Sequence, residues 1–264
     1  MEKYKIGFAL SGGSARGAAH IGAIQALMEY GIKPDIIAGT SIGAIVGAFI
    51  ADGYKPAEIL DIFMKYASKR KMLTFARLGI SRESILKMKG IEKILKNNLR
   101  SKTFEDLTMP LIVACTELDT AQIRYFSTGE LIPVIKASAS IPILFAPTAV
   151  NGLRYVDGGM LNNLPVRAIR DMCEKIIAIH VNPIRQYAGN KPIHGFKQIS
   201  ERVFNLAIRA NIVEDKEMCD IYIEPEGLEN YSVFDISKVK DIYDAGYKST
   251  IKLLKSNILH QSNF

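Results

Sequence analysis

Short apolar strands alternate with helices along most of this chain, and that alternation limits the folds open to it. The segment "YKIGFAL" (residues 4–10) has the length and apolar character of a buried strand, and apolar residues then recur at helical spacing over 16–30. A second apolar segment, 34–39, is followed by a second helical segment, 42–52. Strands that are joined through helices pair in parallel. We therefore predict an α/β fold with a mainly parallel central sheet.

The alternation continues in the second half of the chain. A third helix opens at Pro56, and Asn151-Gly152 predicts a hairpin between two strands within 145–159. Further strands are expected at 109–118, 121–128, 175–182 and 220–225, and further helices at 129–140, 164–172, 195–213 and 235–256.

One basic segment interrupts this pattern. Residues 66–104 are mostly helical in propensity and contain no expected strand, so we interpret them as a helical insertion or cap within a single domain spanning 1–264. From Lys65 to Lys102 there are twelve Lys or Arg against two acidic residues, a net charge of +10, and the remainder carries −3 of the total +7.

Two interpretations of this charge stay open. A basic amphipathic helix can lie on an anionic membrane, so 65–102 is a candidate for peripheral membrane contact. The same residues equally suit a solvated helical face packed on the domain. Nucleic acid is not expected as a partner, because no interleaved aromatic platform accompanies the charge.

The N-terminus and the cysteines bear on the compartment. "MEKYKIGFALSGG" has too short an apolar run for a secretory signal, and the longest apolar tract, 36–51, is too short to span a bilayer. The three cysteines are odd in number and form neither a disulfide framework nor a metal-binding pair. We expect a cytoplasmic protein, peripheral at the inner membrane surface if the basic segment binds lipid, with no metal and no cofactor.

A glycine-rich loop, "SGGSARGAAHIG", separates the first strand from the first helix. Glycines let successive backbone N–H groups point outward at a helix N-terminus, where an anion can bind. Phosphate motifs fail here: a Walker A loop requires Lys-Ser or Lys-Thr after Gly17, and a dinucleotide loop requires glycine where Ser14 stands. A structural turn and an anion site both remain open from the residues alone.

The pentapeptide "GTSIG", Gly39 to Gly43, fits the G-x-S-x-G pattern of a nucleophile elbow. That motif needs a strand before it and a helix after it, and both are expected here. The flanking glycines would relieve crowding and leave the Ser41 hydroxyl exposed at the carboxyl end of the sheet. The alternative is a turn of small residues without a chemical role.

A nucleophilic serine needs a base. His20 lies in the first helix and His180 in an apolar strand, while His194 and His260 occur in polar stretches. Asp157 is more suggestive, because it ends an expected strand and is followed at once by Gly158 and Gly159. Its alternative is an acid that only stabilises a turn.

Together these motifs resemble those of the patatin-like phospholipase family, which is similar to the cytosolic phospholipase A2 core. The resemblance implies a three-layer α/β/α fold and a Ser-Asp dyad without a catalytic histidine. It assigns Ser41 as nucleophile, Asp157 as base and the N–H groups of Gly12, Gly13, Ser14 and Ala15 as oxyanion donors. Arg16 would hold the loop or attract a head group, beside Gly17. The block "ASASIPILFAP" (137–147) is also similar to the family, whereas Ser14 departs from the usual middle glycine.

The family implies a serine acyl hydrolase that cleaves ester bonds of lipids, with a lipid or lysophospholipid as substrate. Three alternatives stay open. An acyltransferase would pass the acyl group to an alcohol or thiol. An α/β-hydrolase would use Ser41, Asp157 and His180 as a triad, although its nucleophile would follow only the second strand. A catalytically silent lipid-binding protein would leave the Ser-Asp pair unused.

Overall fold

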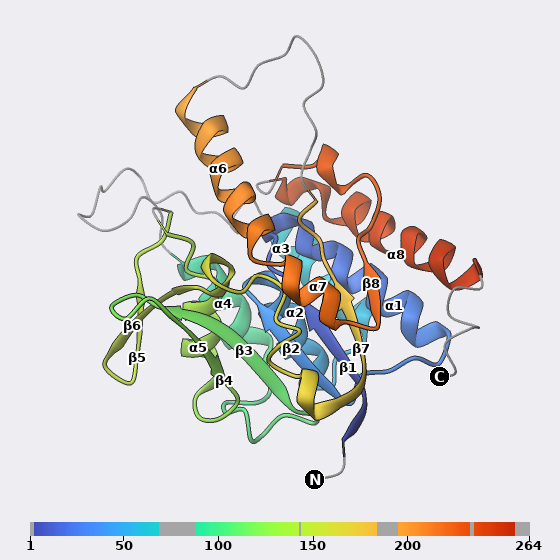
Figure 1. Ribbon diagram of the computed structural model, residues 1–264, viewed down its shortest axis with the longest axis horizontal. Coiled ribbons are helices and arrows are strands. Elements are labelled where there is room, and N and C mark those ends of the chain that lie inside the picture. The colour runs from blue at the N-terminus through green and yellow to red at the C-terminus, as the bar shows by residue number, and fades with distance from the viewer. Residues whose placement is uncertain (1–2, 69–87, 143, 184–194, 233–234, 257–264) are drawn as a thin grey trace.

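The computed structural model describes residues 3–68, 88–142, 144–183, 195–232 and 235–256. Within them, eight strands form one sheet in the order β5-β6-β3-β2-β1-β7-β8, with β4 paired to β3 (Figure 1). The strands are β1 (Tyr4–Leu10), β2 (Ile36–Thr40), β3 (Leu111–Glu117), β4 (Gln122–Phe126), β5 (Thr148–Val150), β6 (Leu153–Asp157), β7 (Cys173–Ile179) and β8 (Ile221–Ile223). The pairs joining β3, β2, β1, β7 and β8 are parallel, which confirms the mainly parallel sheet.

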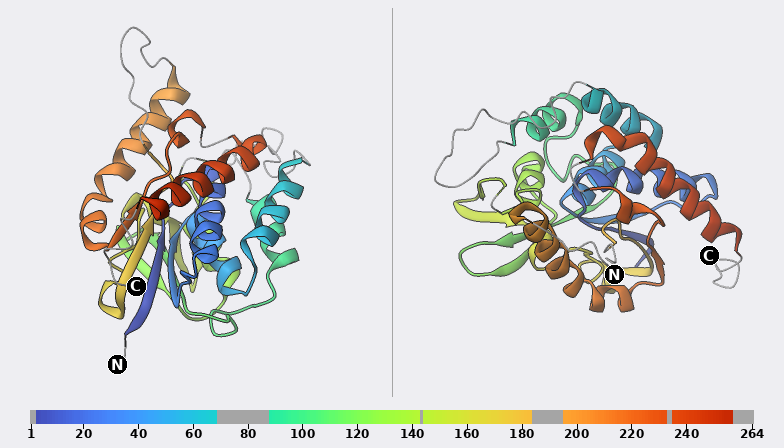
Figure 2. Two further views of the ribbon diagram at one scale, coloured as in Figure 1. Left: turned by 90° about the vertical axis from the view of Figure 1, so that its right-hand side faces the viewer. Right: turned by 90° about the horizontal axis from the view of Figure 1, so that it is seen from above.

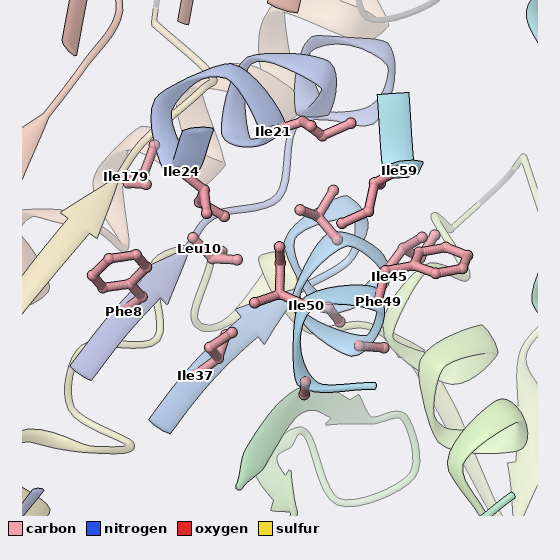
Figure 3. Packing of buried hydrophobic residues seen from close by; sticks show 14 of the residues in the cluster. Phe8, Leu10, Ile21, Ile24, Ile37, Ile45, Phe49, Ile50, Ile59 and Ile179 are labelled. Carbon is pink, nitrogen blue, oxygen red and sulfur yellow. The ribbon is translucent and has the colours of Figure 1, made fainter. Parts of the chain in front are cut away.

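Helices cover the sheet, most heavily on one face (Figure 2). They are α1 (Ala18–Glu29), α2 (Ile42–Ala51), α3 (Pro56–Ser68), α4 (Lys89–Asn98), α5 (Leu131–Ser138), α6 (Phe196–Ala210), α7 (Val213–Met218) and α8 (Val239–Lys255). Figure 3 shows Ile24 of α1 and Ile50 of α2 near Leu10 of β1 in the main core.

Side-chain alternation divides the core into two clusters. Phe8 and Leu10 of β1 lie in the larger cluster, under the helices, and Ala9 lies in the smaller one on the opposite face. Successive residues of a strand point to opposite faces, so a strand with a covering layer on each side is apolar throughout. This accounts for the unbroken apolar character of the central strands.

The smaller cluster has an irregular cover, and here one prediction is wrong. Residues 164–172 do not form an α-helix; they form turns that end in the 3₁₀ turn η3 (Arg170–Met172). Pro165 has no N–H to donate, and the N–H of Arg167 donates instead to the Asp215 carboxylate at 2.9 Å. Leu164, Val166 and Ile169 are fully buried against the sheet. The apolar residues of this segment recur because they are buried against the sheet, and not because the segment is a helix.

Other boundaries shift by a few residues. A 3₁₀ turn, η1 (Ser14–Gly17), precedes α1, and the helix expected over 195–213 divides into α6 and α7. The strand β7 ends at Ile179, so His180 lies just past it rather than inside it. Of the basic segment 66–104, residues 69–87 lie outside the described part. No helix in the described ranges has the length and apolar character needed to cross a bilayer.

Candidate active site

Ser41 stands at the sharp turn between β2 and α2. Its backbone has φ 55° and ψ −120°, a conformation that a residue with a side chain adopts only under strain. A Cβ at Gly43 would lie 2.2 Å from the carbonyl oxygen of Leu10, and one at Gly39 would lie 2.7 Å from the Ala44 Cα. The two glycines are therefore required by close backbone contacts, as the elbow motif predicts.

A neighbouring serine holds this turn from behind. The Ser41 N–H donates to the Ser138 hydroxyl at 2.8 Å, and that hydroxyl donates to the Ala114 carbonyl at 2.7 Å. Ser138 is fully buried at the end of α5, within the block that resembles the family. The pair of bonds ties the elbow to β3 and helps to keep the strained conformation in place.

Asp157 ends β6 and is almost fully buried, at 3% exposure. Its carboxyl accepts a hydrogen bond from the Gly159 N–H at 2.8 Å, and the Ser41 hydroxyl lies beside it. Burial raises the pKa of Asp157 from 3.8 to about 6, against the smaller lowering effects of Ser41 and the Gly159 N–H. A Cβ at Gly158 would lie 2.3 Å from the Ala114 carbonyl oxygen, so the turn after Asp157 packs directly on β3.

The glycine loop reaches the same place but offers fewer donors than expected. The Gly12 N–H donates to the Asn163 carbonyl at 3.1 Å, so this predicted oxyanion donor already has an acceptor in the structure. The N–H groups of Gly13, Ser14 and Ala15 donate to no acceptor within the described chain. Ser14 has φ 52°, so it takes up the left-handed conformation that glycine would adopt more readily.

Arg16 and Gly17 hold the loop in position. The buried Arg16 guanidinium donates to the Tyr231 carbonyl at 2.8 Å and to the Asn182 side chain at 2.8 Å. These bonds favour a tether over a head-group contact. Gly17 lies against Ile42, where a Cβ would come within 2.0 Å of the Ile42 side chain. The loop is thereby packed onto the elbow helix.

An apolar pocket of about 100 Å³ opens beside Ser41. Ser14 and Ala15 of the loop and Ser41 of the elbow belong to its lining, and the other lining side chains are apolar. The lining comprises Ser14, Ala15, Ser41, Ile42, Ile45, Phe63, Ile91, Ile94, Leu95, Ala139, Ile141, Phe145, Ile236 and Val239. The described part of the basic insertion, α4, thus contributes wall residues. Such a pocket suits an acyl chain whose carbonyl carbon reaches Ser41.

Neither of the two described histidines hydrogen-bonds to Ser41. His180 Nδ1 lies 2.8 Å from Glu224 and 2.9 Å from the Tyr222 hydroxyl, and its buried Nε2 has no partner among the described residues. His20 Nε2 contacts the Ser11 carbonyl at 2.8 Å, and burial lowers the pKa of His20 to about 4. The other two predicted histidine candidates, at 194 and 260, lie outside the described residues.

Three polar residues of the site escaped prediction. Ser138 acts through its bond to the Ser41 N–H, and Asn163 through its carbonyl bond to Gly12. Asn211 donates to the Gly159 carbonyl at 2.8 Å and accepts from the Asn163 N–H at 3.0 Å. The "ASAS" block and the "NN" after Asp157 were the available signals. Nothing in the local sequence marks Asn211, because its partners lie about fifty residues away.

The chain is similar to known proteins over most of its length. A model of the family "Patatin-like phospholipase" matches residues 8–170. The mouse patatin-like phospholipase domain-containing protein 7 is 27% identical over 92% of this chain, and the lysophospholipase NTE1 of Meyerozyma guilliermondii is 26% identical over 95%. The chain spans only 20% and 19% of those two proteins.

A solved structure supports the fold. VipD from Legionella pneumophila superposes with a TM-score of 0.54 at 16% identity, covering 97% of this chain and 67% of VipD. Its similarity concerns the architecture alone. The family model, by contrast, covers the glycine loop, the elbow and the Asp157 turn together. On that match over more than half of its residues, this chain belongs to the patatin-like phospholipase family.

Proposed function

We propose that this protein is a serine acyl hydrolase that cleaves carboxylic ester bonds of lipids, with Ser41 as nucleophile and Asp157 as its base. One observation carries the proposal: the Ser41 hydroxyl, on a strained elbow that lines an apolar pocket, lies beside the buried Asp157 carboxyl. Strained serines and carboxyls with raised pKa values concentrate at catalytic sites.

The reaction follows from this geometry. As the Ser41 oxygen bonds to the ester carbonyl carbon, its proton passes to Asp157 and the carbonyl oxygen becomes an oxyanion. When the bond to the leaving alcohol breaks, Asp157 returns the proton to that alcohol and an acyl-serine remains. Water then repeats the sequence, giving its proton to Asp157 and releasing a free fatty acid and Ser41. A pKa near 6 makes Asp157 a stronger base than an ordinary carboxylate while leaving it ionised at neutral pH.

The N–H groups of Gly13, Ser14 and Ala15 are the proposed oxyanion donors. They have no acceptor within the described chain, and Ser14 and Ala15 line the pocket together with Ser41. The helix that follows adds a favourable dipole at this end. Removing one such donor typically lowers the rate by about 10²–10³-fold.

The substrate class follows from the pocket and the relatives. An apolar wall built by α3, α4, α8 and the residues Ala139, Ile141 and Phe145 suits a fatty acyl chain. The name of the Meyerozyma relative specifies a lysophospholipase, and that of the mouse relative a phospholipase domain. We therefore place a phospholipid or lysophospholipid ester first among substrates.

The test compares ester and lysophospholipid hydrolysis by the wild type and Ser41→Ala, with fluorophosphonate labelling as a second readout. We expect the wild type to release free fatty acid and to be labelled at Ser41, and Ser41→Ala to do neither. The matched control is Ser140→Ala, a buried serine near the site whose hydroxyl does not contact Ser41. Equal hydrolysis by Ser41→Ala and the wild type would refute the proposal. Transfer of the acyl group to an added alcohol, in place of fatty acid release, would indicate the acyltransferase.

A further inference from the structure

Helix α6 carries an apolar stripe that faces away from the protein. Ile199, Val203 and Leu206 are 50%, 59% and 48% exposed. Their spacing of four and then three residues places them within about 60° of the helix circumference, because each residue turns an α-helix by about 100°. The stripe is therefore one continuous apolar surface along two turns of α6.

The opposite side of α6 is the one that packs on the protein. Ile208 lies about 180° from the centre of the stripe and is only 4% exposed. A helix held by one apolar face usually presents a polar face to water. Here the outer face is apolar as well, and a contiguous exposed apolar surface typically marks an interaction site.

Hydrogen bonds at two points of α6 attach it to the candidate active site. At its C-terminal end, Asn211 donates to the Gly159 carbonyl of the Asp157 turn. Further up the helix, Asn205 accepts from Asn182 at 3.1 Å, and Asn182 accepts from Arg16 of the glycine loop. The stripe thus belongs to a helix bonded to both the base and the loop.

The figures place α6 at the same end of the molecule as the pocket. β1 runs upward from the N-terminus in Figure 1, so its carboxyl end, where the glycine loop begins, is uppermost. α6 stands above the sheet in Figure 1 and again in the left view of Figure 2. A flat partner that covered the stripe would therefore approach the end of the sheet that holds Ser41.

Charge specifies the kind of partner. Arg202 and Arg209 lie about 70–90° from the centre of the stripe, both on the same side of it, so a basic border runs along one edge. An apolar stripe with a basic border matches the interface of an anionic bilayer, in which acyl chains lie beneath phosphate head groups.

We propose that the α6 stripe is the surface by which this protein docks on an anionic lipid membrane. Ile199, Val203 and Leu206 enter the boundary between head groups and acyl chains, and the arginines lie at the level of the phosphates. This inference rests on the proposed lipid hydrolase activity for its biological purpose, but the docking itself can be measured without catalysis. It assigns membrane contact to α6 rather than to the basic segment 65–102.

The experiment measures co-sedimentation with vesicles made of equal parts phosphatidylcholine and phosphatidylglycerol. The test variant is Ile199→Gln/Val203→Gln/Leu206→Gln, since glutamine keeps helix propensity while removing the apolar surface. The matched control, Tyr30→Gln/Leu153→Gln, removes two side chains of similar exposure, 48% and 46%, located away from α6. Hydrolysis of a short soluble ester is measured in parallel.

We expect the triple variant to lose about tenfold or more in vesicle affinity and the control to lose less than about twofold. Soluble ester hydrolysis should stay unchanged, because the stripe does not touch the reacting groups. If the triple variant does not fold, Val203→Gln alone, with an expected loss of about threefold, replaces it.

Equal vesicle binding by the triple variant and the wild type would overturn the inference. So would a wild-type dimer that the triple variant converts to a monomer, because the stripe would then join two copies of the chain. Vesicle binding that depends on the stripe, without hydrolysis of any ester, would leave the docking surface standing and refute the proposed function.

Discussion

Two buried aspartates of this protein, Asp157 and Asp215, have opposite surroundings. Asp215 is fully buried and accepts bonds from the Asn162 side chain at 2.6 Å and from the backbone and guanidinium of Arg167. Asp157 is buried almost as deeply but accepts one hydrogen bond, from the Gly159 N–H, and lies beside the Ser41 hydroxyl, with no cation paired to it among the described residues.

The difference indicates which carboxylate is structural and which is reactive. A buried charge is stable when a cation and several donors surround it, and Asp215 has both. Asp157 lacks the cation, so its charged form is disfavoured and its pKa rises to about 6. The same residue type thus stabilises one part of the fold and serves as a candidate base in another.

The largest expected effect is the loss of activity in Asp157→Asn. Removing a general base typically lowers the rate by about 10²–10⁴-fold, and the amide keeps the size and most hydrogen bonds of the carboxyl. Ester hydrolysis and thermal unfolding are measured on the same preparation. Asp244→Asn, at a partly exposed position on α8, should keep full activity. Activity within about tenfold of the wild type would make Asp157 a structural residue like Asp215.

The reverse outcome is expected at Asp215. Asp215→Ala leaves Arg167 and Asn162 without their shared partner, and breaking a fully buried pair costs about 3–5 kcal/mol. Because the Arg167 side chain is 35% exposed, we expect a smaller loss, about 2–3 kcal/mol in the free energy of unfolding. Urea denaturation measures it, and fluorophosphonate should still label Ser41 in the folded fraction. If Asp215→Ala is as stable as the wild type but is not labelled, Asp215 is a reactive residue and not a structural one.

The difference in stability between Asp157→Asn and the wild type should depend on pH. A carboxyl with a folded pKa of about 6 and an unfolded value near 3.8 stabilises the fold while protonated and loses that contribution as pH rises through 6. Between pH 4 and pH 7, the free energy of unfolding of the variant should therefore rise relative to that of the wild type by about 1–3 kcal/mol. Taking the difference between the two proteins cancels the opposite effect of His20, whose lowered pKa destabilises the fold as pH falls. A difference that does not vary with pH would contradict a raised pKa.

The smallest expected effect concerns the support of the elbow. Ser138→Ala removes the acceptor of the Ser41 N–H, which should cost about 1 kcal/mol in stability and slow acylation several-fold. Ser140→Ala is the control, because it also removes buried hydrogen bonds but none to Ser41. Equal labelling rates in the two variants would show that Ser138 has no special effect on the nucleophile.

Local patterns predicted the strands, the elbow and the turn after Asp157. A strand, a G-x-S-x-G turn and a helix are contiguous in the sequence, so their geometry follows from neighbouring residues. The occupied Gly12 N–H could not be predicted in this way, because its acceptor, Asn163, lies 151 residues further on. The support of Asp157 by Asn211 is equally remote.

The spacing of apolar residues in the sequence did not show what each apolar surface packs against. Residues 164–172 have apolar residues at near-helical spacing, yet they cover the sheet through turns. In α6 the stripe of Ile199, Val203 and Leu206 has the spacing of a buried face, yet the buried residue, Ile208, lies on the other side. A pattern of apolar residues shows that a surface is apolar but does not say whether protein, water or another partner covers it.

The central claim is that Asp157, rather than a histidine, activates Ser41. The most direct test measures the rate of fluorophosphonate labelling of Ser41 between pH 4 and pH 8 in the wild type, Asp157→Asn and His180→Ala. We predict that the labelling rates of the wild type and His180→Ala fall as the pH is lowered, with an apparent pKa of about 6. The labelling rate of Asp157→Asn should be low at every pH. Fast labelling of Asp157→Asn, or loss of labelling in a folded His180→Ala, would contradict it.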